Sequence, residues 1–165
     1  MNTDPFQTEL QSCLPDLWRY ACALCRDRDL ADDLVQDCAE RALRKRALWR
    51  PRGPLKPWLM KMLLNLWRNH CKKHARSAAL PAFDPAGDLT LVAPDHLSGA
   101  LDLGDTARAL AQLPEEQREA LLTVVLGGLS YKDAARTLGI PAGTLMSRLG
   151  RARAALRQAI LETPE

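Results

Sequence analysis

The chain has 165 residues, of which 47% are hydrophobic and 26% charged, and its formal net charge is +3. This length predicts one ordinary domain or two very small ones, and the apolar content excludes global disorder. The uncharged stretches are shorter than the roughly 18–20 apolar residues of a membrane span, and the N-terminal residues do not resemble a signal peptide. We therefore expect a cytoplasmic protein without membrane insertion.

The charges are unevenly distributed along the chain. Residues 41–83 hold twelve Lys and Arg residues and no carboxylate, whereas residues 81–106 hold five Asp and no cation. A second basic stretch contains no acid between 133 and 162. Two basic segments around an acidic, Pro- and Gly-containing spacer are typical of a polyanion-binding chain, because a merely solvated face usually mixes both signs. No segment alternates with the two-residue period of a strand, so the pattern predicts an all-α protein with domains at 1–80 and 100–165 joined by a linker at 81–99.

The first expected helix begins near Phe6 or Pro15 and ends near Cys25. Cys22 and Cys25 form a C-x-x-C pair, and His and Cys recur at 70–74, so a zinc site is conceivable. The pair lies inside a helical pattern without turn residues for a metal knuckle, which favours buried cysteines. The odd cysteine count favours reduced thiols. We expect neither a metal nor another cofactor.

The second expected helix begins near Asp29 and ends near Leu48, with acidic residues in its first turns that suit the helix dipole. One face is apolar: Ala31, Leu34, Val35, Cys38 and Ala42. The opposite face is polar and mainly acidic: Asp29, Asp33, Gln36 and Glu40. A solvated face is the ordinary explanation for this stripe. Because the surrounding segment is basic, the stripe is also a candidate contact for a protein partner.

The third expected helix runs from about Leu55 to Ala79, after a break at 50–54. Amides and cations fall on one stripe at Asn65, Asn69, Lys72 and Arg76, and Trp58 and Lys61 project to the same side. The other side is mainly apolar: Leu59, Leu63, Leu66, Trp67 and His70. Amides among cations suit base edges and phosphates. Trp58 either offers a stacking surface for unpaired bases or packs against the Pro-rich loop before it.

The last part of the chain has the pattern of a helix-turn-helix. A helix opens at Leu113–Pro114 and ends near Leu126, and Ser130 caps a short helix that reaches Leu138. Gly139–Pro141 forms a turn, and the final helix begins at Gly143. A plain helical hairpin is the alternative.

The final helix has a scaffold face and a polar face. Leu145, Leu149, Ala152 and Leu156 are expected to point toward the scaffold, and Thr144, Ser147, Arg148 and Arg151 form a polar stripe at the N-terminal end. That is where a recognition helix meets base edges. Arg153 and Arg157 diverge from the stripe and suit phosphate contacts.

Several of these segments together resemble a known family. They are DLADDLVQD at 29–37, Pro57–Leu59 with Asn65 and Lys72–Lys73, LPEEQR at 113–118, SYKDAA at 130–135 and GTLMSRLGRAR at 143–153. In this order and spacing they are similar to the extracytoplasmic-function (ECF) group of bacterial RNA polymerase sigma factors, in the sigma-70 family. The resemblance covers nearly the whole chain.

The resemblance implies a role for each unit. The first, similar to sigma region 2, would bind the β′ clamp helices of RNA polymerase core through Asp29, Asp32, Asp33, Leu34, Gln36 and Asp37. It would recognise and help melt the −10 element through Trp58, Lys61, Asn65, Arg68, Asn69, Lys72, Lys73 and Arg76. The second, similar to region 4, would contact the β flap and read the −35 element of promoter DNA through Ser130, Tyr131, Lys132, Thr144, Ser147, Arg148, Arg151 and Arg153. Many members of the group are regulated by an anti-sigma factor.

The leading function is therefore a sigma factor that directs RNA polymerase to promoters. An alternative is a sigma-like interaction module that sequesters an anti-sigma factor without binding DNA, and the Arg-containing stripe of the last helix argues against it. An ordinary two-domain repressor is disfavoured by the polymerase-binding resemblance. An enzyme is disfavoured because the sequence has no Gly-rich phosphate loop and no credible nucleophile–base set.

Overall fold

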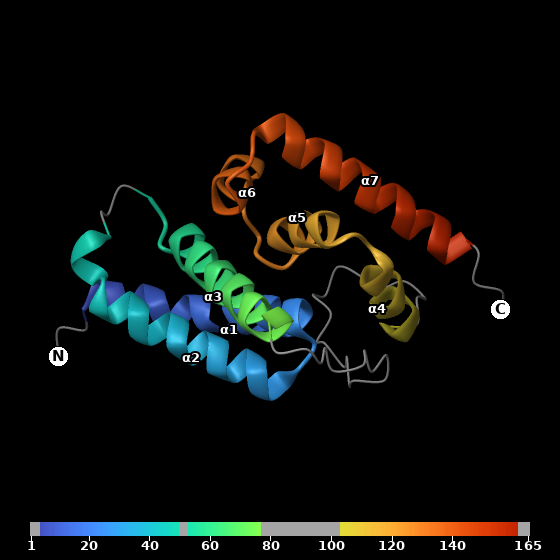
Figure 1. Cartoon of the computed structure of the whole chain (residues 1–165). Coiled ribbons are helices and arrows are strands. Elements are labelled where there is room, and N and C mark those ends of the chain that lie inside the picture. The colour runs from blue at the N-terminus through green and yellow to red at the C-terminus, as the bar shows by residue number, and fades with distance from the viewer. Residues whose placement is uncertain (1–3, 50–52, 77–102, 162–165) are drawn as a thin grey trace.

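The computed structural model describes residues 4–49, 53–76 and 103–161, and every regular element in these ranges is helical, which confirms the all-α fold (Figure 1). The elements are α1 (Pro5–Cys25), α2 (Arg28–Arg44), a 3-10 helix η1 (Arg46–Leu48), α3 (Lys56–Arg76), α4 (Leu103–Gln112), α5 (Glu115–Val125), α6 (Tyr131–Leu138) and α7 (Ala142–Leu161). Within the described ranges, no helix has the length and apolar character needed to cross a membrane.

The helices of the first unit follow local sequence signals, with small differences from the expected ends. Asp4 caps α1 by accepting from the Phe6 amide, so the helix starts at Pro5, and the exposed Pro15 lies inside it. The carbonyl that Pro15 leaves without an amide donor is on a solvated face, where water can satisfy it. The second helix was expected to reach Leu48, but α2 ends at Arg44 and the chain continues as η1. The third helix is described as far as Arg76.

The second unit contains one helix that the sequence pattern did not predict, α4. The other boundaries agree with the expected caps. The Ser130 hydroxyl accepts from the Asp133 amide at the start of α6, which confirms the predicted N-cap. Gly139 ends α6 with φ 69°, a left-handed conformation that glycine adopts without a Cβ penalty. The turn that follows places α7 across α5 and α6.

The apolar face predicted for α2 is confirmed, because Ala31, Leu34, Cys38 and Ala42 are buried there. On α3, Leu59, Leu63 and Leu66 are buried as expected, while Trp67 and His70 are only half-buried. Met60 and Leu64 are also fully buried on α3. A helix with buried residues on more than one side has more than one packing partner, and α3 packs against α1, α2 and α6.

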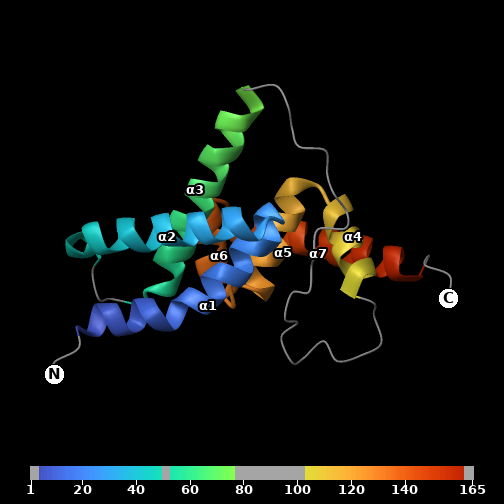
Figure 2. The same cartoon turned by 90° about the horizontal axis from the view of Figure 1, so that it is seen from below.

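The two units pack directly against each other. Contacts between α1 and α5 and between α3 and α6 join them into one continuous core (Figures 1 and 2). The approach is close at Gly127, where an added Cβ would lie 2.6 Å from the Met60 Cε atom and 2.3 Å from the Thr123 carbonyl oxygen. The expected linker at 81–99 lies outside the described residues, so the domain boundaries stay a prediction.

Candidate nucleic-acid interface

The acidic face of α2 is available to a partner. Asp29, Asp32, Asp33 and Gln36 are exposed, and the Asp32 carboxylate accepts a 2.7 Å hydrogen bond from the Trp18 indole N–H of α1. Two other residues of the predicted polymerase-binding set have structural contacts. Leu34 is only 7% exposed, and Asp37 forms a 2.8 Å ion pair with Arg41. The stripe is thus built on a helix whose inner face is anchored in the core.

The outer face of α3 is cationic over the C-terminal half of the helix. Exposed polar side chains follow one another along the helix at Lys61, Asn65 and Asn69, and the two lysines Lys72 and Lys73 lie in its C-terminal half. Between α2 and α3 lies a cavity of about 390 Å³, lined in part by Asn69, Lys72 and Lys73 and by Arg41 of α2. Cations around a recess suit a polyanion. The backbone of Arg76 ends the helix, but its side chain lies outside the described atoms.

Trp58 has neighbours on two sides. Its ring lies edge-on to Phe6 of α1, with centroids 6.5 Å apart, and the residue is half-buried. A cavity of about 340 Å³ beside it is lined by Pro54, Pro57 and Lys61, and also by residues of α6. Trp58 therefore packs in part against α1, and part of its surface borders a cavity that the Pro-rich loop also lines.

Arg68 pairs with a carboxylate of the second unit. Its guanidinium donates to both Glu119 oxygens, at 3.3 and 2.7 Å, and the Glu119 residue is 4% exposed. The hydrogen bonds to Glu119 raise the pKa of Arg68 above its ordinary value. Arg68, one of the residues predicted to contact the −10 element, is therefore paired with the Glu119 carboxylate of the same chain.

The start of α6 and the middle of α7 present one polar surface. Ser130, Tyr131 and Lys132 are exposed at the beginning of α6. Arg153 of α7 donates a 3.1 Å hydrogen bond to the Tyr131 hydroxyl, which holds the two helices together at the surface. These four predicted −35 residues therefore lie at one end of the helix-turn-helix.

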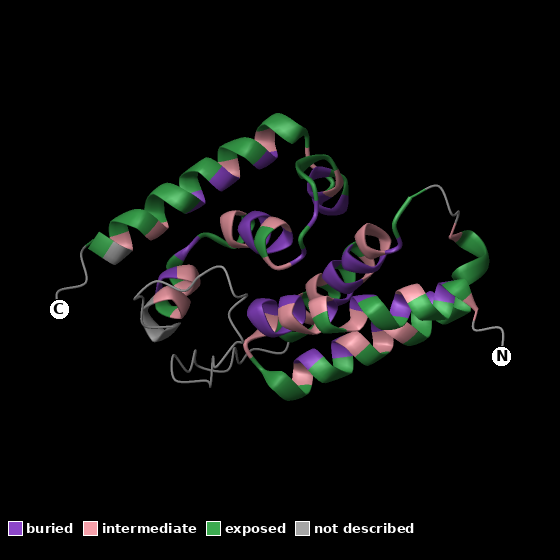
Figure 3. Ribbon diagram, turned by 180° about the vertical axis from the view of Figure 1, so that it is seen from behind, coloured by how far each residue is buried: buried purple, intermediate pink, exposed green. Residues whose placement is uncertain are grey.

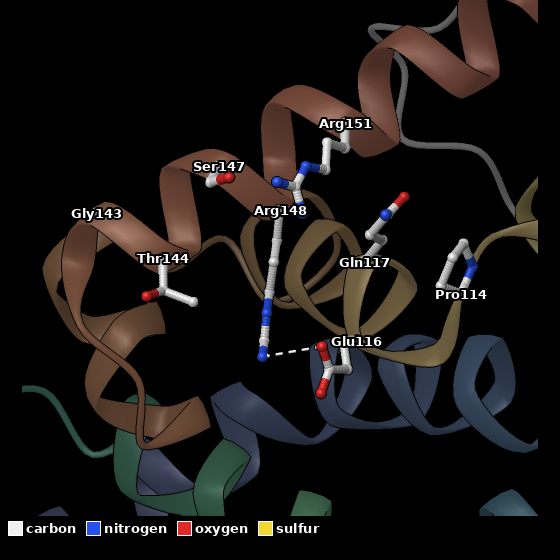
Figure 4. A pocket seen from close by; sticks show the side chains of 8 residues that line it. All are labelled: Pro114, Glu116, Gln117, Gly143, Thr144, Ser147, Arg148 and Arg151. Atoms are coloured by element: carbon white, nitrogen blue, oxygen red, sulfur yellow. Dashed lines mark ion pairs between the residues drawn. The ribbon is translucent and has the colours of Figure 1, made fainter.

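The N-terminal part of α7 has the polar stripe beside a shallow cavity. Only the edge of α7 that faces α5 and α6 is buried (Figure 3), with Leu145, Leu149 and Ala152 at its centre. Thr144, Ser147, Arg148 and Arg151 line a cavity of about 400 Å³ together with residues of α5 (Figure 4). Arg148 forms a 3.0 Å ion pair with Glu116 across this cavity. Ser147 and Arg151 are exposed.

Sequence reasoning missed the carboxylates that face these arginines. Glu116 and Glu119 belong to α5, and the sequence marked only Glu116 and Glu115 as the acidic first turn of that helix. Met146 was also overlooked, although it is 59% exposed on α7. It is an exposed apolar side chain between two residues of the polar stripe, Thr144 and Ser147.

The cysteines are free thiols within α1, α2 and α3. Burial raises the pKa of Cys22 and of Cys25 to about 11, and that of Cys38 to about 12, so these thiols are protonated near neutral pH. Within the described ranges, no group of three or more His, Cys, Asp or Glu side chains is arranged to hold a metal ion.

Comparison with known proteins assigns the family. The family model described as "Sigma-70, region 4" matches residues 103–156, and the "Sigma2 domain of PhyR" model matches residues 10–64. The ECF RNA polymerase sigma factor EcfG of Rhodopseudomonas palustris is 36% identical over 93% of this chain and 84% of its own length. The ECF RNA polymerase sigma factor SigC of Mycobacterium tuberculosis is 36% identical over 86% of this chain and 75% of its own length.

A solved structure agrees with these matches. It is the sigma factor RpoE of Bartonella quintana in complex with the anti-sigma factor NepR, with a TM-score of 0.80 and 32% identity over 98% of this chain and 100% of that chain. Sequence and fold therefore agree over nearly the full length of the molecule. The chain belongs to the ECF RNA polymerase sigma factors.

Proposed function

We propose that the chain directs RNA polymerase core enzyme to specific promoters, and that each of its two units binds a different part of the promoter. The main support for this proposal is that the chain aligns with an ECF sigma factor over 93% of its length. Each unit also has a cationic surface. In this proposal residues 1–80 bind core polymerase and the −10 element, residues 100–165 bind the −35 element, and residues 81–99 connect them. The chain acts through binding, without covalent chemistry, in the cytoplasm where the polymerase and its promoters are.

The polymerase contact is assigned to α2. Its exposed carboxylates, Asp29, Asp32 and Asp33, would meet the β′ clamp helices, and the second unit would meet the β flap. Acidic side chains at the start of a helix are favoured by the helix dipole, and they can pair with cations of a partner. The buried face of α2, including Leu34, fixes the orientation of this stripe against α1 and α3.

The −10 contact is assigned to α3 and the −35 contact to α6 and α7. Exposed amides and lysines such as Asn65, Asn69 and Lys72 suit phosphates and base edges of a melted strand, and the exposed part of Trp58 suits stacking. On α7, Ser147 and Arg151 project from the N-terminal half of the helix, the part of a recognition helix that enters the major groove. Each phosphate contact releases counterions, so binding should weaken steeply with salt.

We also propose that an anti-sigma factor regulates the chain. Support comes from the RpoE structure, because that similar sigma factor was solved with its anti-sigma factor NepR. The alternative of a sigma-like module that only sequesters an anti-sigma factor is supported by the match to the PhyR sigma2 domain over residues 10–64. The two functions differ in one respect, which is whether the chain itself binds promoter DNA.

Core binding is tested with purified polymerase core and the full chain. Asp33→Asn should weaken co-purification with core, and Glu115→Gln, which removes the same charge from an exposed position on α5, should not. Formation of a ternary complex with promoter DNA then separates a sigma factor from a module that only sequesters. A chain that binds an anti-sigma factor but neither core nor DNA would contradict the proposal.

A further inference from the structure

Trp18 of α1 contacts the acidic face of α2. Its indole N–H donates to the Asp32 carboxylate at 2.7 Å, a short distance that is typical of a hydrogen bond to a charged acceptor. The two residues are 14 positions apart, and they meet because α1 and α2 pack side by side (Figure 1). Asp32 is exposed and Trp18 is half-buried. One carboxylate oxygen is thus bound to α1, and the other is available to a partner.

The hydrogen bond fixes the direction of the Asp32 carboxylate. A surface aspartate that is not held samples several rotamers, and a partner that binds it must order the side chain. Asp37, in contrast, pairs with Arg41 of the same helix, so its charge is partly compensated within α2. The indole of Trp18 is a neutral donor and leaves the full negative charge on Asp32. Asp32 is therefore a preorganised anionic contact.

The electrostatic effect of Asp32 on α1 agrees with this position. Burial, followed by the charge of Asp32, raises the pKa of Cys22 of α1 to about 11. The carboxylate therefore lies against α1, on the side of α2 that faces the Trp18 indole.

The indole ring supplies a second element of recognition. Trp18 packs against the core with part of its surface, and the remainder is exposed beside Asp32. Among aromatic side chains, tryptophan attracts cations most strongly, up to about 6 Å from the ring centroid. A cation paired with the second Asp32 oxygen can reach that distance, because the first oxygen lies 2.7 Å from the indole nitrogen. Arginine fits best, since its planar guanidinium both pairs with a carboxylate and stacks on an aromatic ring.

The helical hairpin does not depend on this exposed bond for its stability. Leu17 and Tyr20 of α1 and Ala31 and Cys38 of α2 are 0% exposed and belong to one apolar core. A polar contact at an exposed carboxylate adds little to such packing. A half-exposed tryptophan beside a fixed carboxylate is instead typical of a protein interface, where tryptophan is enriched among the residues that dominate binding.

We propose that Trp18 and Asp32 together bind one cationic side chain of the polymerase core, most favourably an arginine. Trp18 positions the carboxylate through its N–H and contacts the same cation through its ring. The inference rests on the proposed function, which assigns the core contact to the exposed carboxylates of α2. It extends that contact to α1 and gives Asp32 a partner group of defined chemistry.

The test is a double-mutant cycle on the affinity of the full chain for purified polymerase core, measured by fluorescence anisotropy of N-terminally labelled protein. Trp18→Phe keeps an aromatic ring and removes the N–H, Trp18→Leu removes the ring as well, and Asp32→Ala removes the acceptor. Trp67→Phe is the matched control, because it makes the same change at a half-buried tryptophan of α3 outside the proposed site. Urea denaturation checks that each variant is folded.

Trp18→Phe should weaken core binding about 2- to 10-fold, which is the cost of ordering one side chain on binding. Trp18→Leu and Asp32→Ala should weaken it further, because the ring or the charge is also lost, and Trp67→Phe should leave it unchanged. In the Asp32→Ala background, Trp18→Phe should change the affinity by less than about twofold, since the carboxylate that it positions is absent.

A merely structural role of Trp18 would give the same loss with and without the Asp32 carboxylate, and that result would overturn the inference. Unchanged core affinity in Trp18→Phe, or equal affinities of Trp18→Phe and Trp18→Leu, would also overturn it. In each of these cases the wild type still binds core, so the proposed function stands. If the wild type itself does not bind core, the proposed function and the inference both fail.

Discussion

Replacing Arg148 with alanine tests whether α7 reads DNA, because the structure separates its effect on stability from its effect on binding. The guanidinium lies 3.0 Å from the Glu116 carboxylate, whose side chain is 71% exposed. An ion pair this open to water contributes about 1 kcal/mol or less. The Arg148 side chain is 21% exposed, so packing of its alkyl stem adds about 1 kcal/mol. The free energy of unfolding should therefore fall by at most about 2 kcal/mol, which urea denaturation measures.

Arg148→Ala should also lower the affinity for DNA, separately from its effect on stability. If Arg148 leaves Glu116 and forms a bidentate contact with a base, its loss costs about 1–3 kcal/mol, or about 5- to 150-fold in affinity for a −35 duplex. Fluorescence anisotropy at several salt concentrations measures this affinity. A base contact lowers affinity for the preferred sequence, whereas a phosphate contact lowers affinity for all sequences and reduces the salt slope by about 1.

Glu116→Gln is the matched control for this prediction. It removes the partner's charge and keeps the cation, so DNA affinity should hold or increase because the arginine is released. Core polymerase binding should be unchanged in both variants. The reasoning is refuted if Arg148→Ala abolishes core binding, or if both variants lose DNA affinity equally, since Arg148 would then serve only to hold α5 against α7.

Three further predictions concern the scaffold. Burial raises the pKa of Cys38 from 9.0 to about 12, so this thiol stabilises the folded state below pH 9 and loses that contribution as the pH rises toward 12. In urea denaturation its share of the lost free energy of unfolding should be about 2 kcal/mol at about pH 10.5, and Cys38→Ala should remove that share. Leu63→Ala empties a fully buried site on α3 and should cost about 2–5 kcal/mol in the same denaturation assay. Ser130→Ala removes the α6 cap and should cost about 1 kcal/mol, with amide exchange increasing first at Asp133.

The sequence predicted the elements whose ends are set by local chemistry. Ser130 and Gly139 are short-range signals, and the buried face of α2 follows from helical spacing alone. The helix α4 was missed because it follows an acidic segment with Pro and Gly. Apolar residues do recur there at helical spacing, at Leu103, Ala107 and Leu110 and at Ala109 and Leu113, and this was the available sign.

The contact between the units could not be read from the sequence. Tyr20 and Thr123 are 103 residues apart, and no periodicity within one helix reports a partner at that distance. The same holds for Arg68, which the family resemblance placed among the residues that would contact the −10 element. Met60 gave an indirect sign, because an apolar residue beyond the face that packs on α1 and α2 needs a further partner, here the second unit at Gly127.

Run-off transcription with purified core polymerase on a library of promoter fragments tests the central assignment most directly. The full chain should allow core to initiate from a subset of fragments that share two sequence elements, and Arg148→Ala should reduce initiation that depends on the upstream element while core binding persists. Absence of polymerase-dependent initiation on every fragment, with the chain still binding an anti-sigma factor, would contradict the account and identify the chain as a module that sequesters that factor.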